Sequence, residues 1–309
     1  MNGTVGCLLA FTHAPHALLS VAQPALGALL AAQGFPEPRV MWLGGAAASA
    51  GMLCVYPLND LLDMQTDREE AQGLARLDAT PGCRADGTRV RHPLAQGAVP
   101  VWIGVAWVVG MGLTGFILAT KLKRACGLLF LGCVGLEAVY CALRRRTWLK
   151  VIPAGSVVGL GGMAGWYAVG GFDAGAAAYF LLLSCWEIFG RNVANDLADL
   201  SLDAPIGIRT IATTYGPAWS ARTCLVGSVA TVLAAALQRG PIRLRLPLVA
   251  SAGWAMASPA LRLHREPSEP EAQRYFNRAS LFPPLAFLAA ATVFALRGKP
   301  NGHRRRQGR

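Results

Sequence analysis

The sequence predicts an all-α, multi-pass membrane protein whose helices, about nine in number, form a bundle around a central cavity. Three observations predict this fold class. Hydrophobic residues make up 53% of the 309 positions and charged residues only 15%, a composition that differs from that of soluble globular proteins. The chain contains 35 glycines, which let membrane helices pack closely. Apolar runs as long as a membrane span follow one another from end to end.

The length of the apolar runs places each predicted helix, because a helix needs about 20 apolar residues to cross a bilayer. The runs lie at roughly 15–33, 40–62, 98–119, 124–143, 151–171, 174–196, 217–237, 244–262 and 279–296. Proline interrupts several of them, which predicts local kinks.

Two connections between these runs, 64–97 and 197–216, are longer and more polar than the others. They follow the second and sixth spans, so both are predicted to lie on the same side of the membrane and to form a cap over the bundle. Lys and Arg are more numerous in the connections on this side, which favours a cytoplasmic cap in a protein of the cell membrane. The basic tail at 297–309, on the other side, weakens this preference.

The net charge of +12 favours lipid headgroups or an anionic substrate as partners. The basic residues lie in short loops and do not gather with aromatic residues on one face, so we expect no nucleic-acid partner. The eight cysteines form no Cys-x-x-Cys pair, so the sequence predicts neither a disulfide framework nor a zinc site.

Two similar acidic motifs stand at the ends of the second and sixth spans. The first reads NDLLDMQTD from Asn59 to Asp67, and the second reads NDLADLSLD from Asn195 to Asp203. Residues four apart lie on one face of a helix, so each motif is expected to present an amide and two carboxylates in one row. The rows are Asn59, Asp63 and Asp67 in the first motif, and Asn195, Asp199 and Asp203 in the second, which continues upstream through Arg191 and Glu187. Their matching placement suggests two related halves, about 1–145 and 146–296, within a single domain of residues 1–309.

Carboxylates at the end of a membrane span are costly unless they face a cavity, a partner or an ion. Six of them converging would repel one another without cations, and oxygen ligands suit Mg²⁺ shared with substrate phosphates. The two rows therefore predict a site for a metal-bridged diphosphate. Arginines close to the motifs can pair with phosphate oxygens, and these are Arg68, Arg91 and Arg209.

On these motifs the chain resembles the UbiA superfamily of intramembrane prenyltransferases. The segment 92–97, HPLAQG, is similar to the family's Arg-Pro-Leu/Ile-Pro-Ser-Gly turn, and the segment 140–145, YCALRR, to its Tyr-Ser/Thr-x-x-Lys-Arg segment. The segment 207–210, GIRT, resembles the Gly-x-Lys/Arg-Thr that follows the second motif. Two departures are a longer distance from Asp67 to the HPLAQG turn, and His92 in place of the usual Arg, with Arg91 as the nearest substitute.

The resemblance implies a multi-pass membrane enzyme of nine helices that transfers a polyprenyl group from an allylic polyprenyl diphosphate to a small acceptor. It implies Mg²⁺, as two ions bound with the diphosphate. The implied metal ligands are Asn59, Asp63, Asp67, Asp199 and Asp203. The implied diphosphate-binding residues are Arg68, Arg91, Asn195 and Arg209, and the implied residues for stabilising the leaving group are Tyr140, Arg144, Arg145 and Arg209.

The acceptor is left open by the residues. An aromatic ring in lipoquinone-type biosynthesis is expected, because such enzymes are the commonest members of the family. Alternatives are a terpene cyclase of the same family, which has no acceptor, and a transferase acting on a non-aromatic lipid or a chlorophyllide. A membrane transporter is a more remote alternative, and the apolar spans argue against a soluble prenyl-diphosphate synthase. The oligomeric state is also left open.

Overall fold

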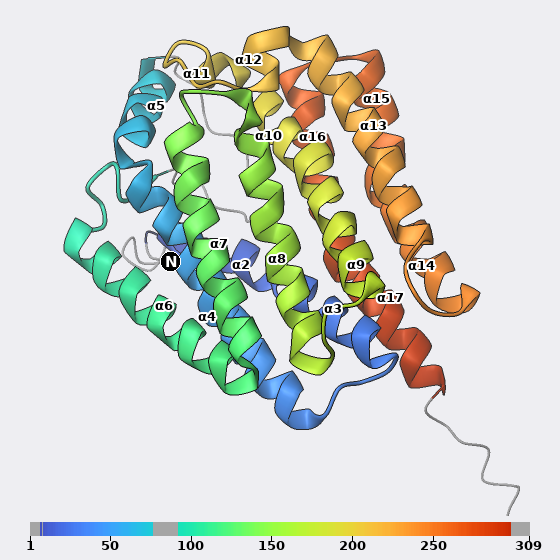
Figure 1. The fold of residues 1–309 in the computed structure, drawn as a ribbon. Helices are drawn as coiled ribbons and strands as arrows, with labels where there is room; N and C mark the ends of the chain where they lie inside the picture. The colour runs from blue at the N-terminus through green and yellow to red at the C-terminus, as the bar shows by residue number, and fades with distance from the viewer. Residues whose placement is uncertain (1–6, 8, 77–91, 298–309) are drawn as a thin grey trace, which may run out of the picture.

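The computed structural model describes residues 7, 9–76 and 92–297, and within them it is helical without β-strands. The helices stand side by side as a bundle (Figure 1). In the N-terminal part they are α2 (Ala14–Ser20), α3 (Ala22–Ala32), α4 (Pro38–Leu62), α5 (Met64–Arg76), α6 (Val101–Leu122), α7 (Arg124–Leu143) and α8 (Val151–Val169), with a short 3₁₀ turn, η1 (Trp148–Lys150), before α8.

The C-terminal part contains two helices that change their hydrogen-bonding pattern midway. Its elements are α9 (Ala174–Cys185), the π-helical segment η2 (Trp186–Asn192), α10 (Val193–Ala198), α11 (Leu200–Asp203), α12 (Ile211–Tyr215), α13 (Pro217–Ala236), α14 (Ile242–Ala252), the π-helical segment η3 (Gly253–Ala257), α15 (Ser258–Arg265), α16 (Glu269–Ala279) and α17 (Phe282–Arg297). Single π-helical turns inside α-helices are often found at functional sites.

Seven helical stretches of the described chain are long and apolar enough to cross a membrane. They are Leu9–Ala32, Pro38–Leu62, Val101–Leu122, Arg124–Leu143, Trp148–Val169, Pro217–Ala236 and Glu269–Leu296. Each coincides with one predicted span. The other two predicted spans, 174–196 and 244–262, fall on the helices that η2 and η3 interrupt, and the total of nine spans stays a prediction.

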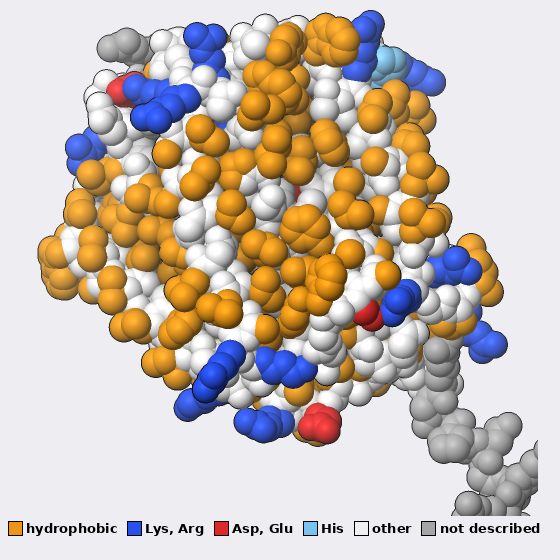
Figure 2. Space-filling model, viewed as in Figure 1, with side chains coloured by type: hydrophobic (Ala, Val, Ile, Leu, Met, Phe, Trp, Pro, Cys, Tyr) orange, Lys and Arg blue, Asp and Glu red, His pale blue; other side chains and the backbone are white. Residues whose placement is uncertain are grey.

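The outer surface of the bundle is suited to lipid. Large apolar side chains are exposed around it, including Trp42 at 83%, Leu128 at 68% and Val226 at 67%. Figure 2 shows hydrophobic side chains across the middle of one face, whereas Lys and Arg gather toward its two ends. This distribution matches an apolar bilayer core between two polar surfaces.

Glycine allows the closest helix contact inside the bundle, between α3 and α8. A Cβ atom added to Gly165 would lie 1.8 Å from the carbonyl oxygen of Pro24, and one added to Gly27 would lie 2.6 Å from the carbonyl oxygen of Gly162. Neither space admits a methyl group, so these glycines set the distance between the two backbones.

The short polar helices α5, α11 and α12 lie together at one end of the bundle (Figure 1), and α5 contacts α11. Helix α5 continues the first acidic motif, and α11 ends the second. The two polar connections therefore meet at the end of the bundle that carries the motifs, while their role as a cap stays a prediction.

Candidate active site

Both acidic motifs interrupt their helices at the same position. Helix α4 ends at Leu62, where Asp63 has φ −95° and ψ 6°, and the equivalent Asp199 between α10 and α11 has φ −103° and ψ 15°. The prediction of a continuous helical row is therefore wrong at these two residues, which adopt the sparsely populated region between helix and strand. Their backbone N–H groups still donate to the carbonyls four residues earlier, at 2.9 and 3.1 Å. The chain kinks without losing the spacing of four.

Arg144, just after α7, pairs with two of the three carboxylates of the first motif. Its Nη1 lies 2.9 Å from Asp63 and 3.2 Å from Asp67, and its Nη2 lies 3.7 Å from Glu70. Asp63 and Asp67 therefore face the same point, as predicted. Burial raises the pKa of Asp63 above its usual range, although the Arg144 charge opposes this rise.

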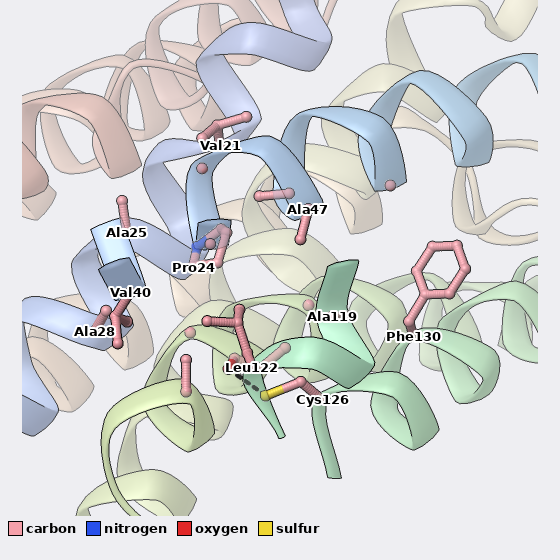
Figure 3. Close-up of a pocket in the computed structure, with 18 of the residues that line it drawn as sticks. Val21, Pro24, Ala25, Ala28, Val40, Ala47, Ala119, Leu122, Cys126 and Phe130 are labelled. Atoms are coloured by element: carbon pink, nitrogen blue, oxygen red, sulfur yellow. Dashed lines mark hydrogen bonds between the residues drawn. The ribbon is translucent and has the colours of Figure 1, made fainter. Parts of the chain in front are cut away.

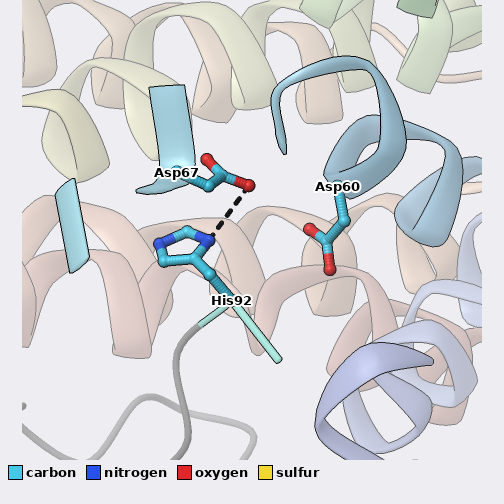
Figure 4. Close-up of side chains that lie close together, drawn as sticks. All are labelled: Asp60, Asp67 and His92. Carbon is cyan, nitrogen blue, oxygen red and sulfur yellow. Dashed lines mark ion pairs between the residues drawn. The ribbon is translucent and has the colours of Figure 1, made fainter. Parts of the chain in front are cut away.

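His92 is a second basic partner of Asp67 and Glu70. Its Nδ1 lies 3.1 Å from Asp67 and its Nε2 lies 3.3 Å from Glu70. Burial alone would lower the pKa of His92, but the two carboxylates outweigh it and raise the pKa to about 9. Oxygens of Asp60 and Asp67 and a ring nitrogen of His92 lie within 4.8 Å of one another (Figure 4). His92 is thus a basic side chain at the position where the UbiA superfamily usually has Arg.

The second motif contacts residues from the end of α7 and the start of α8. Asp196 accepts a hydrogen bond from Lys150 Nζ at 2.8 Å, and the same ammonium lies 5.3 Å from the centre of the Tyr140 ring. Asn195 Nδ2 lies 3.5 Å from an oxygen of Asp199, at the limit of a hydrogen bond. Tyr140 therefore lies beside the second motif through Lys150, a residue that was not predicted, and the role of Tyr140 in the reaction stays a prediction.

Arg144 also contacts the segment that follows the second motif. Burial and the charge of Asp196 raise the pKa of Asp203 to about 8, while Lys150 and Arg144 act in the opposite direction. The backbone N–H of Arg209, whose side chain is exposed, donates to the carbonyl of Arg144 at 2.9 Å. The GIRT segment is therefore held against the end of α7.

Two other predicted arginines lie around the site. Arg68 is exposed, and its Nε donates to the carbonyl of Ala95 at 3.3 Å. Arg145 is also exposed and pairs with Glu69. Arg91 lies outside the described residues, so its predicted role is untested.

Asn59 does not face Arg144. Its Nδ2 donates to Glu137 Oε1 at 2.7 Å and lies 3.4 Å from the Cys141 sulfur. Glu137 was missed from the sequence, although an acidic residue in an apolar run, three and seven positions before Tyr140 and Arg144 on one helix face, was a usable signal.

An apolar chamber with a volume of about 280 Å³ lies between α3, α4, α6, α7 and α8. Small side chains such as Ala47 and Ala119 line it, together with Phe130 (Figure 3). Toward the motifs it reaches Val55 on α4 and Cys133 on α7, each one helical turn before Asn59 and Glu137 respectively.

The donor set at the motifs fits a hard divalent cation. The described residues gather seven buried carboxylates here, and a divalent cation would neutralise part of their negative charge. The carboxylates are Asp60, Asp63, Asp67, Glu70, Asp196, Asp199 and Asp203, and the basic partners are His13, His92, Arg144 and Lys150.

Comparison with known proteins identifies the family and supports the fold. A 4-hydroxybenzoate octaprenyltransferase of Aromatoleum aromaticum is 32% identical over 236 residues, which cover 74% of each chain. A UbiA homologue from Aeropyrum pernix K1 superposes with a TM-score of 0.70 at 20% identity, covering 91% of this chain and 98% of that one. A UbiA homologue from Archaeoglobus fulgidus, bound to DMAPP and Mg²⁺, gives 0.62 at 19% identity, covering 92% and 99%. The UbiA prenyltransferase family profile matches residues 20–294, so this chain belongs to that family and is an integral-membrane prenyltransferase.

Proposed function

We propose that this protein transfers a polyprenyl group from an allylic polyprenyl diphosphate to an aromatic acceptor of the 4-hydroxybenzoate type, in lipoquinone-type biosynthesis. The observation that carries the proposal is the continuity of the acidic site with an apolar chamber: Val55 lines the chamber, and Asn59 and Asp63 follow at intervals of one helical turn. A diphosphate suits the charged site and a hydrocarbon tail suits the chamber. The name of the A. aromaticum relative supports the acceptor class and a long prenyl chain.

Mg²⁺ is the proposed cofactor. The carboxylates of the two motifs are ligands that suit it, and the homologue bound to DMAPP and Mg²⁺ supports it. Two ions are proposed, in keeping with two motifs. When bound, Mg²⁺ neutralises charge on the diphosphate as it departs. The proposed ligands are Asn59, Asp63, Asp67, Asp199 and Asp203, with Asn195 and Asp196 beside them.

The residues of the chain then bind and orient the donor. Arg144 and His92 contact the motif carboxylates and are close enough to the site to donate to diphosphate oxygens when a donor is bound. The planar guanidinium of Arg144 matches such oxygens in shape. Tyr140 lies beside Lys150 and supports this end of α7. Arg68, Arg145 and Arg209 are proposed to contact the diphosphate from the rim of the site, as is Arg91.

The reaction breaks the bond between the allylic carbon and the diphosphate oxygen, and the bonding electron pair leaves with diphosphate. A π-electron pair of the acceptor ring forms the new carbon–carbon bond, and loss of the ring proton restores aromaticity. The chamber keeps water away from the allylic carbon, which limits hydrolysis of the donor.

We further propose that the motif end of the bundle faces the cytoplasm in the cell membrane, on the distribution of Lys and Arg. The polar segments would then act as a cap on that side. The two related halves of the chain remain a proposal based on the placement of the motifs.

The proposal is tested with the purified protein, Mg²⁺, octaprenyl diphosphate and 4-hydroxybenzoate, by measuring released diphosphate and prenylated product. Asp63→Asn and Asp199→Asn are each expected to reduce both by at least about a hundredfold, because oriented charge at the reacting group contributes effects of this size. Asp173→Asn is the matched control, since Asp173 caps α9 and pairs with Arg239 away from the motifs.

Failure of the native protein to release diphosphate from any allylic donor refutes the proposal. Release without acceptor, with a hydrocarbon product, favours the cyclase alternative. Release with a chlorophyllide or a glycerol lipid, and not with an aromatic acid, replaces the acceptor and keeps the donor site.

A further inference from the structure

Glu137 is a buried carboxylate inside a predicted membrane span. It is 9% exposed, and it lies six residues before the end of α7, about 9 Å along the helix axis. Its carboxylate accepts a hydrogen bond from Asn59 at 2.7 Å, and it takes part in no ion pair within the described residues. An ionisable group at such a depth is costly, so it points to a function in the site.

The position of Glu137 relative to the two parts of the site narrows that function. Helices α4 and α7 contact each other, and successive turns carry first Val55 and Cys133 in the chamber and then Asn59 and Glu137. One turn after Asn59 and two turns after Glu137, Asp63 pairs with Arg144. The Asn59–Glu137 pair therefore lies between the apolar chamber and the charged motifs. With a diphosphate at the motifs and a tail in the chamber, the reacting allylic carbon lies at this level.

The donor substrate cannot satisfy the Glu137 carboxylate. The carboxyl oxygens of Glu137 can accept hydrogen bonds, as Oε1 does from Asn59, whereas a prenyl chain has no donor to offer them and a diphosphate is itself negative. A hydroxyl group on the acceptor is the substrate group that can donate to this side chain.

We propose that Glu137, held by Asn59, forms the polar contact of the acceptor subsite and accepts a hydrogen bond from the hydroxyl group of a phenolic acceptor. This inference rests on the proposed function and adds the residue that recognises the hydroxyl group of the acceptor. The contact holds the ring carbons next to the hydroxyl group close to the allylic carbon.

The test compares 4-hydroxybenzoate with its methyl ether, 4-methoxybenzoate, which lacks the hydrogen-bond donor. Each is measured as a substrate, or as a competitive inhibitor where no product forms, in the native protein and in Glu137→Gln. We expect Glu137→Gln to weaken use of the phenol by about tenfold to a hundredfold, as expected for a hydrogen bond to a charged group. The inhibition or use of the ether should change less than threefold.

Two further measurements keep the result interpretable. Calorimetric binding of inorganic diphosphate with Mg²⁺ should be the same in the native protein and in Glu137→Gln, and Glu137→Asp should restore part of the preference for the phenol. Glu266→Gln, an exposed glutamate between α15 and α16, is the matched control.

An equal loss for phenol and ether overturns the inference, and so does weaker Mg²⁺-dependent diphosphate binding, which would make Glu137 a metal ligand. Failure of the proposed function has a different signature, because the native protein would then consume no allylic diphosphate with either compound.

Discussion

Replacing Arg144 by Met separates the charge of this residue from its size. The guanidinium bridges two carboxylates whose side chains are only 5% and 3% exposed, at 2.9 and 3.2 Å. Asp67 keeps His92 as a partner in the variant, but Asp63 loses its ion pair with no other within the described residues. Breaking a buried pair by removing one partner costs about 3–5 kcal/mol, and we expect the lower end because Asp63 alone is stranded.

Divalent metal should reverse this loss. A ligand at a hundred times its dissociation constant stabilises the folded state by about 2.7 kcal/mol, so Mg²⁺ should recover most of the stability of Arg144→Met. The measurement is unfolding of the detergent-solubilised protein, followed by tryptophan fluorescence, with and without Mg²⁺. Arg146→Met, at an exposed neighbouring position, is the control. An unchanged stability of the metal-free variant, or an Mg²⁺ effect no larger than in the native protein, would refute the reasoning.

Three other predictions follow from described contacts. Stability of the metal-free protein should fall as the pH rises from about 6.5 to 9, because the pKa of His92 is raised to about 9 and that of Asp203 to about 8, so the folded protein keeps protons that the unfolded chain has lost. In His92→Gln the unfolding free energy should lose part of this slope below pH 8, where Asp203 still contributes, and most of it from pH 8 to 9; a stability that rises with pH contradicts the reasoning. Gly165→Ala should destabilise the protein by more than about 1–3 kcal/mol, because the added Cβ overlaps the carbonyl of Pro24. Gly161→Ala, with nothing within 4 Å of the added Cβ, should be nearly neutral, and equal unfolding midpoints for the two variants would contradict the close contact of α3 and α8. Lys150→Met should remove the ion-pair partner of the buried Asp196 and lower both the stability and the affinity for Mg²⁺ and diphosphate. The double variant Lys150→Met with Asp196→Asn should be more stable than Lys150→Met alone, which a double-mutant cycle measures.

Much of the fold could be read from the sequence because hydropathy and helix length are local properties. The predicted run at 124–143 has the bounds of α7, and the run at 217–237 differs from α13 by one residue. Proline and glycine at the start of α13 mark its boundary in the sequence itself. The interruptions at η2 and η3 were not predicted, since a π-helical turn does not change the apolar composition of the run.

The site was predicted in part for a related reason. The spacing of four survives the break at Asp63, so Asp63 and Asp67 come together at Arg144 although the helix is not continuous, while their role as metal ligands stays a prediction. The partners of the motif residues could not be predicted in this way, because Glu137 is 78 positions from Asn59 and Lys150 is 46 positions from Asp196. Local periodicity carries no information on such long-range pairing.

The π-helical segment η2 affects the direction in which the second motif faces. Hydrogen bonds in such a turn run from residue i to i+5, so the turn contains one more residue than an α-helix and rotates everything after it by about 100° around the axis. Glu187 and Arg191 lie within this turn and pair with each other, and Arg191 also contacts Ser280 Oγ at 3.2 Å. The extra residue rotates the helix that follows η2, and in this rotated part Asp196 accepts a hydrogen bond from Lys150. Insertions and deletions in this helix are therefore constrained by rotation as well as by length.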